Sequence, residues 1–121
     1  MQKEIENKED LVRLVDTFYG RVFQDALLAP HFKSLDFEAH KPRMVQFWAF
    51  VLLDETGYTT NVFDKHRHLN IDARHFDKWL EIFNQTIDDL FIGEKADTAK
   101  FRAKTLAWTF SEKMKHINNH T

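Results

Sequence analysis

The chain has 121 residues, with 17 Lys and Arg against 19 Asp and Glu, a formal net charge of −2 and no cysteine. This length suits one domain with its own hydrophobic core. The lack of cysteine excludes disulfides, thiolate catalysis and Cys-ligated metal centres, and it favours the reducing cytoplasm. Without a basic block, a long apolar run or a signal-like N-terminus, no nucleic-acid or membrane partner is expected.

Only three glycines and two prolines interrupt the chain, so a few long helices are expected. The first should extend from Asn7 to Leu28, because Asn7 with Asp10 three residues later is a start signal and Pro30 lies just beyond the end. Its apolar positions recur with a helical period and are Leu11, Leu14, Val15, Phe18, Val22 and Phe23.

The second helix should run to about Asp54. Pro42 is expected in its first turn, where a missing backbone N–H does not interrupt the hydrogen bonding. The helical spacing of its apolar residues is seen at Met44, Phe47, Trp48, Val51 and Leu52. After the loop DETGYTTN, Asn61 is a candidate cap for a short helical piece, VFDKHRH.

The third long helix should begin at Asp72 and end at Gly93, and the fourth should run from about Glu94 to Ile117. Strand-like alternation of apolar residues is absent. The sequence therefore predicts an all-α fold of four long helices with short helical connectors. A single domain over residues 1–121 is expected, with frayed tails at residues 1–6 and 117–121.

Phenylalanine is unusually frequent, with 12 residues, which fits either a Phe-rich core or a cavity for a flat aromatic ligand. The seven histidines give weak support for a metal site. His66 and His68 would face different directions on a helix. His116 and His120 are four residues apart, but they belong to the polar C-terminal tail. A Gly-rich phosphate loop and a nucleophile elbow are both missing. A helical zinc hydrolase is therefore disfavoured.

Five residues stand out among the other polar and aromatic positions: Tyr19, Phe32, His40, His66 and Trp79. Each alone has an ordinary structural explanation. In order and spacing, the segments around them resemble the truncated haemoglobins, most closely group III, since the glycine pairs of groups I and II are missing. The resemblance covers nearly the whole chain through the motifs FYGRV (18–22), APHF (29–32), AHKPRMVQFW (39–48), DKHRHL (64–69) and HFDKWLEIF (75–83).

The resemblance implies a truncated globin, a two-on-two helical sandwich that binds haem b. His66 would be the proximal iron ligand, with its other ring nitrogen bonded to an oxygen. His68 is the rival ligand. His66 is preferred because the family places a hydrophobic residue three positions after the ligand, and Leu69 fills that place. Phe32 would pack flat against the porphyrin.

On the distal side, the resemblance implies a polar pocket formed by Tyr19, His40 and Trp79. The second helix would line the cavity with Met44, Phe47 and Trp48. Because Pro42 removes a backbone donor near His40, the imidazole is expected at the helix entrance, where it can act as a gate.

The haem propionates require cationic or hydrogen-bonding partners. Arg43 is the first candidate, with Lys41 and Arg67 behind it. His31 and His75 are expected to be surface or capping residues.

The function implied is binding of dioxygen and other diatomic ligands at haem iron. Two polar donors would hold oxygen tightly, which suits conversion of nitric oxide to nitrate or peroxidase-like turnover better than transport, and an unidentified reductase would serve such chemistry. The alternative from another class is a haem-free helical module that binds a protein partner through its aromatic face. A haem-based sensor lacks support because no output domain is attached.

Overall fold

The computed structural model describes residues 2–32, 37–53 and 73–119, with the side chains of Phe32 and residues 114–119 left out. Its helices are α1 (Lys8–Val22), α2 (Ala29–Phe32), α3 (Phe37–Leu52), α5 (Ala73–Leu90) and α6 (Glu94–Asn119). Within these ranges the only extended pairing is an isolated bridge between Lys3 and Phe91, so the predicted all-α class is confirmed. The expected short helix VFDKHRH and its cap lie outside the described residues.

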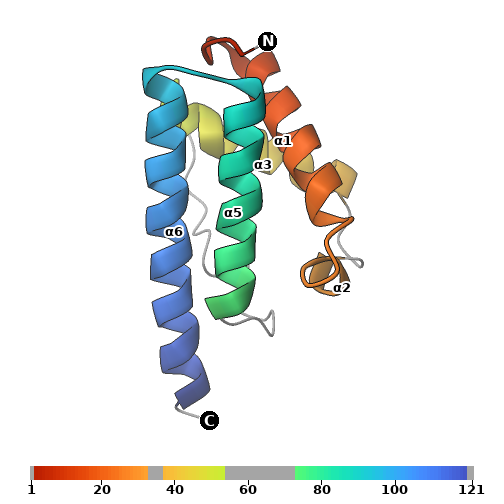
Figure 1. Cartoon of the computed structure of the whole chain (residues 1–121), viewed down its shortest axis with the longest axis vertical. Helices are drawn as coiled ribbons and strands as arrows, with labels where there is room; N and C mark the ends of the chain where they lie inside the picture. The colour runs from red at the N-terminus through yellow and green to blue at the C-terminus, as the bar shows by residue number, and fades with distance from the viewer. Residues whose placement is uncertain (1, 33–36, 54–72, 120–121) are drawn as a thin grey trace.

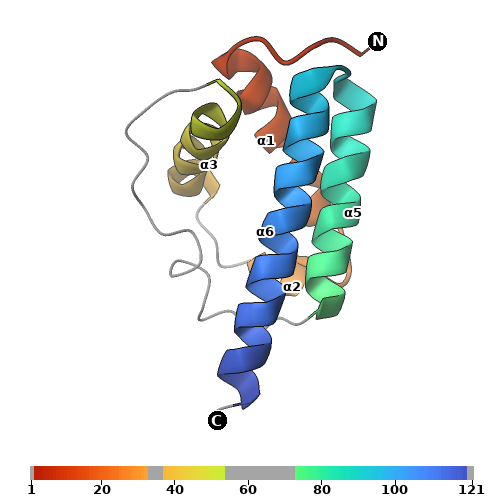
Figure 2. The same cartoon turned by 90° about the vertical axis from the view of Figure 1, so that its left-hand side faces the viewer.

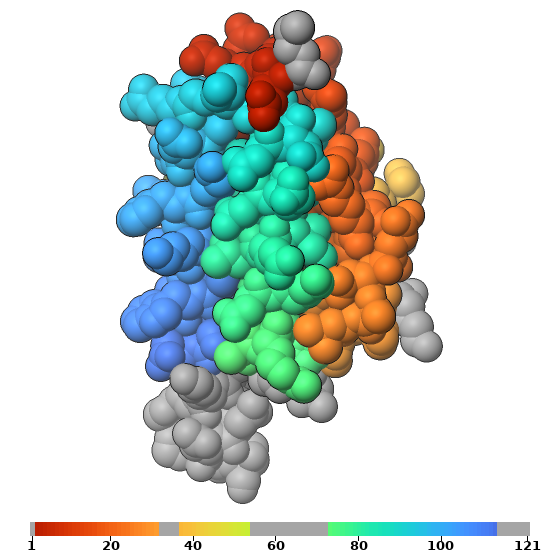
Figure 3. Space-filling view, in the orientation of Figure 1, coloured from red at the N-terminus to blue at the C-terminus, as the bar shows by residue number. Residues whose placement is uncertain are grey.

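The helices are arranged as two pairs. α1 packs against α3, α5 packs against α6, and contacts between α1 and α5 and between α3 and α6 join the two pairs (Figures 1 and 2). α6, α5 and α1 form one continuous face of the molecule (Figure 3). This is the two-on-two sandwich that the resemblance implied.

Helix α1 begins as predicted but ends earlier. The Asn7 side chain accepts a hydrogen bond from the Asp10 N–H at 3.1 Å, within a full capping box. The helix stops at Val22 rather than Leu28, because the Asp25 carboxylate accepts the N–H groups of Leu27 and Leu28 at 2.9 and 3.0 Å. This local bonding competes with continued helix, and it turns the chain into α2.

Helix α3 corrects the expectation for Pro42. The helix begins at Phe37, so Pro42 lies inside it, beyond the first turn. Proline has no N–H to donate to the carbonyl of Glu38, and one internal hydrogen bond of the helix is lost. His40 lies in the first turn of α3, at the entrance where it was expected.

The two ends of the chain are more ordered than predicted. The Lys3 N–H donates to the Leu90 carbonyl at 3.3 Å, the Ile92 N–H donates to the Lys3 carbonyl at 2.9 Å, and Ile5 is 2% exposed. The expectation of a frayed segment 1–6 is therefore wrong for Lys3 and Ile5, because backbone pairing and burial hold them. At the other end, α6 continues through residues 117–119 of the predicted tail.

Small residues allow the close packing of α6 on α5. The buried positions of α6 recur at helical spacing and are Ala96, Ala99, Ala103 and Ala107. Gly93 precedes α6 with φ of 109°, a conformation that favours glycine, and it permits the tight turn between the two helices. Among the described helices, none has the length and apolar character needed to cross a membrane.

Candidate functional site

Tyr19 is the most deeply buried of the three predicted distal donors, at 2% exposure. It lies on α1, and its ring centre is 5.1 Å from that of Phe18, 5.4 Å from that of Phe37 and 6.0 Å from that of His40. Burial raises the pKa of the Tyr19 phenol above its usual value, so the group keeps its proton at any physiological pH. A neutral O–H donor therefore lies beside an imidazole.

Trp79 is half-buried on α5 and belongs to a column of stacked rings. The Trp79 and Phe83 ring centres are 5.7 Å apart with planes at 14°, and Phe83 stacks in turn on Trp48 at 5.0 Å and 21°. Phe18 contacts Trp79 edge-on at 5.6 Å and also contacts Tyr19, so it connects the two predicted donors. Such aromatic contacts restrict the orientation of the Trp79 indole.

Helix α3 provides the remaining described lining. His40, Met44 and Phe47 are half-buried, whereas Trp48 is 2% exposed. Spacings of three, four and seven residues bring His40, Met44 and Phe47 to one side of the helix. Of these three residues, His40 has a ring in contact with the Tyr19 ring.

The predicted propionate partners differ from one another. Arg43 is exposed on α3 and free of the core. Lys41 is instead paired with Asp16 of α1 at 2.8 Å, and this hydrogen bond raises the pKa of Lys41. Lys41 therefore connects α3 to α1, which counts against it as a partner of the propionates.

The two histidines expected at the surface contact each other. His75 is 7% exposed, so the expectation of a surface residue is wrong for it, whereas His31 is half-buried. Their ring centres are 4.5 Å apart with planes at 85°.

Part of the predicted site lies outside the described residues. Phe32 lies in α2, but its side chain is outside the description, and His66, Arg67 and His68 all lie outside the described residues. The assignment of the proximal ligand therefore stays a prediction.

Two residues of the site were missed in the sequence. Phe37 packs on Tyr19, and Phe83 connects Trp79 to Trp48. The helical period of the sequence could place Phe83 on the buried face of α5. The period gives no information on which rings the Phe83 ring stacks against.

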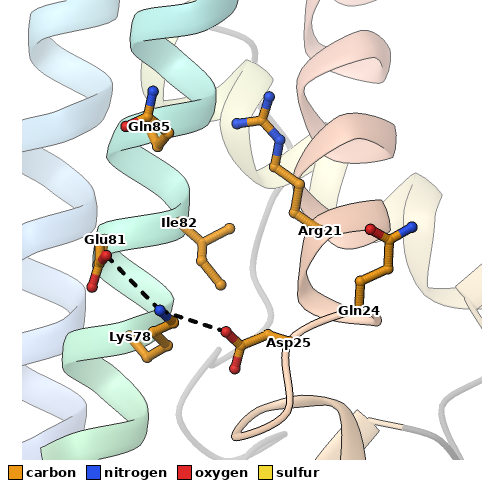
Figure 4. A pocket seen from close by; sticks show the side chains of 7 residues that line it. All are labelled: Arg21, Gln24, Asp25, Lys78, Glu81, Ile82 and Gln85. Atoms are coloured by element: carbon orange, nitrogen blue, oxygen red, sulfur yellow. Dashed lines mark ion pairs between the residues drawn. The ribbon is translucent and has the colours of Figure 1, made fainter.

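A polar cleft of about 280 Å³ lies between the end of α1 and α5 (Figure 4). Lys78 spans it, with its ammonium 3.7 Å from Asp25 and 3.8 Å from Glu81. The other lining residues are Arg21, Gln24, Ile82 and Gln85. Because Arg21 follows Tyr19 by two residues on α1, the cleft lies on the opposite side of this helix from the phenol. Its charged lining does not suit a porphyrin.

The chemistry of the described donor set fits a haem pocket that binds a polar ligand. Three different helices carry the predicted donors: the Tyr19 O–H on α1, the His40 imidazole on α3 and the Trp79 indole N–H on α5. Among the described residues, no group of three or more His, Cys, Asp or Glu side chains could hold a metal ion.

Two helix pairs that enclose a buried tyrosine, packed among phenylalanine rings and one imidazole, match the truncated-globin fold that the sequence predicted. The chain matches the family model described as bacterial-like globin over residues 3–114, and it belongs to this family. It is 27% identical over 127 residues to the group 3 truncated hemoglobin ctb of Campylobacter jejuni, covering 99% of this chain and 100% of that protein.

A solved structure agrees with this assignment. The crystal structure of group III truncated hemoglobin from Campylobacter jejuni matches with a TM-score of 0.84 and 28% identity, over 94% of this chain and 95% of that chain. The resemblance to group III truncated haemoglobins is thus confirmed. The globin family implies a haem cofactor.

Proposed function

We propose that this globin binds haem b through His66 and that dioxygen and other diatomic ligands, such as nitric oxide, bind at the haem iron. The observation that carries the proposal is the buried Tyr19 phenol beside His40, because a pocket that retains a polar ligand needs an O–H or N–H donor. His66 is chosen over His68 because Leu69 follows it by three positions, as in the family pattern.

When bound, haem supplies a ferrous iron to which small diatomic ligands attach. Phe32 would pack against the macrocycle, and Arg43 would meet a propionate at the rim. Apolar cover on the distal side would come from Met44, Phe47 and Trp48, which exclude water and strengthen the nearby hydrogen bonds.

Tyr19 would be the principal donor to a ligand that gains negative charge. A hydrogen bond to a charged acceptor contributes about 1.5–3 kcal/mol, or roughly a 10- to 150-fold slower release of the ligand. Trp79 would add an indole N–H whose direction is restricted by the stacked Phe83 ring. His40 would donate or accept beside Tyr19 and would control entry from the first turn of α3.

Slow release of dioxygen suits chemistry on the ligand better than transport. Reaction of nitric oxide with dioxygen to give nitrate, or peroxidase-like turnover, would benefit from donors that hold the ligand. Either activity consumes electrons, so the protein would work with a reductase in the cytoplasm.

The haem assignment is tested by the absorption spectrum of the purified full chain. A Soret band is expected, and it should be lost or strongly displaced in His66→Ala but retained in the control His68→Ala. A wild-type chain that takes up no haem when offered it would refute the proposal and favour a haem-free interaction module. Retention of the band in His66→Ala with loss in His68→Ala would reverse the choice of ligand.

The role of Tyr19 is tested by the dissociation rate of dioxygen measured by stopped flow. Tyr19→Phe should release the ligand roughly 10- to 150-fold faster. Phe23→Leu is the matched control, because Phe23 packs on the Tyr19 ring at 6.1 Å and offers no donor. An unchanged rate in Tyr19→Phe, or an equal change in the control, would contradict a donor role.

A further inference from the structure

Phe18 connects aromatic rings that belong to two different helices. It is 2% exposed on α1, and its ring centre lies 5.1 Å from that of Tyr19, 5.6 Å from that of Trp79 and 5.4 Å from that of Phe83. All three contacts are edge-to-face. Neighbouring residues of an α-helix point about 100° apart, so Phe18 faces α5 whereas Tyr19 faces α3, where it contacts Phe37.

The Trp79 indole is held by two phenylalanine rings. Phe83 stacks on it with planes at 14°, and Phe18 meets it at 90°. Phe83 is itself 1% exposed and stacked on Trp48 at 5.0 Å, so close packing keeps it in place. Because edge-to-face contacts are directional, Phe18 restricts how the indole turns within its stack. Loss of the Phe18 ring would leave the stack but release the direction of the indole N–H.

The packing of α1 on α5 has a second support besides Phe18. Arg21, one turn after Phe18, donates a hydrogen bond to Thr86 Oγ1 of α5 at 3.2 Å and pairs with Asp89 at 2.8 Å. Thr86 is fully buried. These polar contacts hold the two helices together when the Phe18 ring is replaced by a smaller apolar group. A change at Phe18 therefore moves side chains more than it moves helices.

We propose that Phe18 is a positioning residue that directs the Tyr19 O–H and the Trp79 N–H toward one ligand. The inference rests on the proposed function, in which both groups donate to a ligand at the haem iron. A hydrogen bond weakens steeply when the donor turns away from its acceptor. Two donors on different helices reach one small ligand only when their separation is fixed, and Phe18 contacts both rings. Phe18 acts through these donors and offers no polar group itself.

The role of Phe18 is tested by the dissociation rate of dioxygen from the haem-loaded full chain, measured by stopped flow. Phe18→Leu should release dioxygen about 2- to 12-fold faster, the range that one ordinary hydrogen bond covers. Phe18→Met is a second variant, because methionine fills the space without a ring edge. In a chain that carries Tyr19→Phe and Trp79→Phe, the change at Phe18 should have no further effect. An equal acceleration there would overturn the inference, since a structural role does not depend on the donors.

The C–O stretching frequency of bound carbon monoxide gives a readout that a structural role does not move. A hydrogen-bond donor beside the ligand lowers this frequency, so Phe18→Leu should raise it. Leu11→Ala is the matched control, because Leu11 is fully buried on the same side of α1, two turns before Phe18. This control should lower the urea midpoint without moving the band. An unmoved band in Phe18→Leu, or an equal shift in Leu11→Ala, would contradict a positioning role.

The failure of this inference can be distinguished from the failure of the proposed function. If Tyr19→Phe leaves the release of dioxygen unchanged, the donor role fails and the role of Phe18 fails with it. If Tyr19→Phe accelerates release but neither Phe18→Leu nor Phe18→Met does, the proposed function stands and the inference alone is wrong.

Discussion

Replacement of Gly93 by alanine should destabilise the fold, whereas the same change at Gly20 should stabilise it. Gly93 has φ of 109°, and a Cβ atom there would lie 2.8 Å from Glu4 Oε1 and 3.1 Å from Glu4 Cγ. Gly20 lies within α1 and is exposed, and nothing is found within 4 Å of a Cβ atom added to it. The pair separates backbone conformation from the general effect of adding a methyl group.

The magnitude follows from the backbone. A non-glycine residue in such a conformation costs about 1–3 kcal/mol. The Glu4 side chain is exposed and can rotate away, so its contact adds less than the strain. Alanine at Gly20 should gain about 0.5–1 kcal/mol from its helix propensity. The two variants should thus differ by roughly 1.5–4 kcal/mol in unfolding free energy, or about 6–16 °C in midpoint for a chain of this length.

The assay is urea unfolding followed by circular dichroism, with all variants at the same haem loading. The double variant Glu4→Ala/Gly93→Ala distinguishes strain from crowding, since it should keep most of the loss if the positive φ is the cause. A Gly93→Ala chain as stable as Gly20→Ala would refute the reasoning, and full recovery in the double variant would move the cause to the Glu4 contact.

Three further predictions concern charge and ionisation. Asp10→Asn should lower the free energy of unfolding by about 1–2 kcal/mol at neutral pH. Burial opposes ionisation of this carboxyl, but the hydrogen bond from Lys3 and two backbone N–H groups hold the pKa of Asp10 below its usual value. The contribution of the Asp10 carboxylate to the free energy of unfolding is therefore complete above about pH 4 and is lost as the pH falls further. The urea midpoints of variant and wild type should thus converge in acid. Because the pKa of Tyr19 is raised, the contribution of this neutral phenol to the free energy of unfolding is complete below about pH 10 and is lost in stronger alkali. Tyr19→Phe should leave the rise of tyrosinate absorbance near pH 10 unaltered. A smaller rise in the variant would contradict the burial of Tyr19. Arg43→Gln should accelerate haem transfer to a haem-free acceptor protein, because Arg43 is the proposed propionate partner. Lys41→Gln should not, since Lys41 is paired with Asp16. Equal acceleration in both variants would contradict the assignment of Arg43 over Lys41.

The local pattern was sufficient for much of the helical framework. The cap of α1 at Asn7 and the start of α6 at Glu94 were both predicted, because capping and helical periodicity depend on residues a few positions apart. The order and spacing of short motifs also indicated the family that the comparisons confirmed. The resemblance also placed Tyr19 in the interior, and this residue is 2% exposed.

Features that join distant segments required the tertiary structure. Helix α3 continues through Pro42 although one backbone hydrogen bond is lost there. The burial of Trp48, Ala49 and Leu52 in the core outweighs this loss. Periodicity likewise states which face of a helix is buried but not what lies across from it. The stacking of Phe83 on Trp48 is one such contact between helices remote in the chain, and it was decided only when those helices came together.

The amino-acid order by itself determined that the chain forms a few long helices, how α1 and α6 begin and which globin family the chain belongs to, since these depend on neighbouring residues and their spacing. Only the folded chain decided that Lys3 pairs with the turn after α5, that Lys41 forms an ion pair with Asp16, and that the rings of His31 and His75 are in contact. These are contacts made through space between segments whose separation along the chain leaves no local signal.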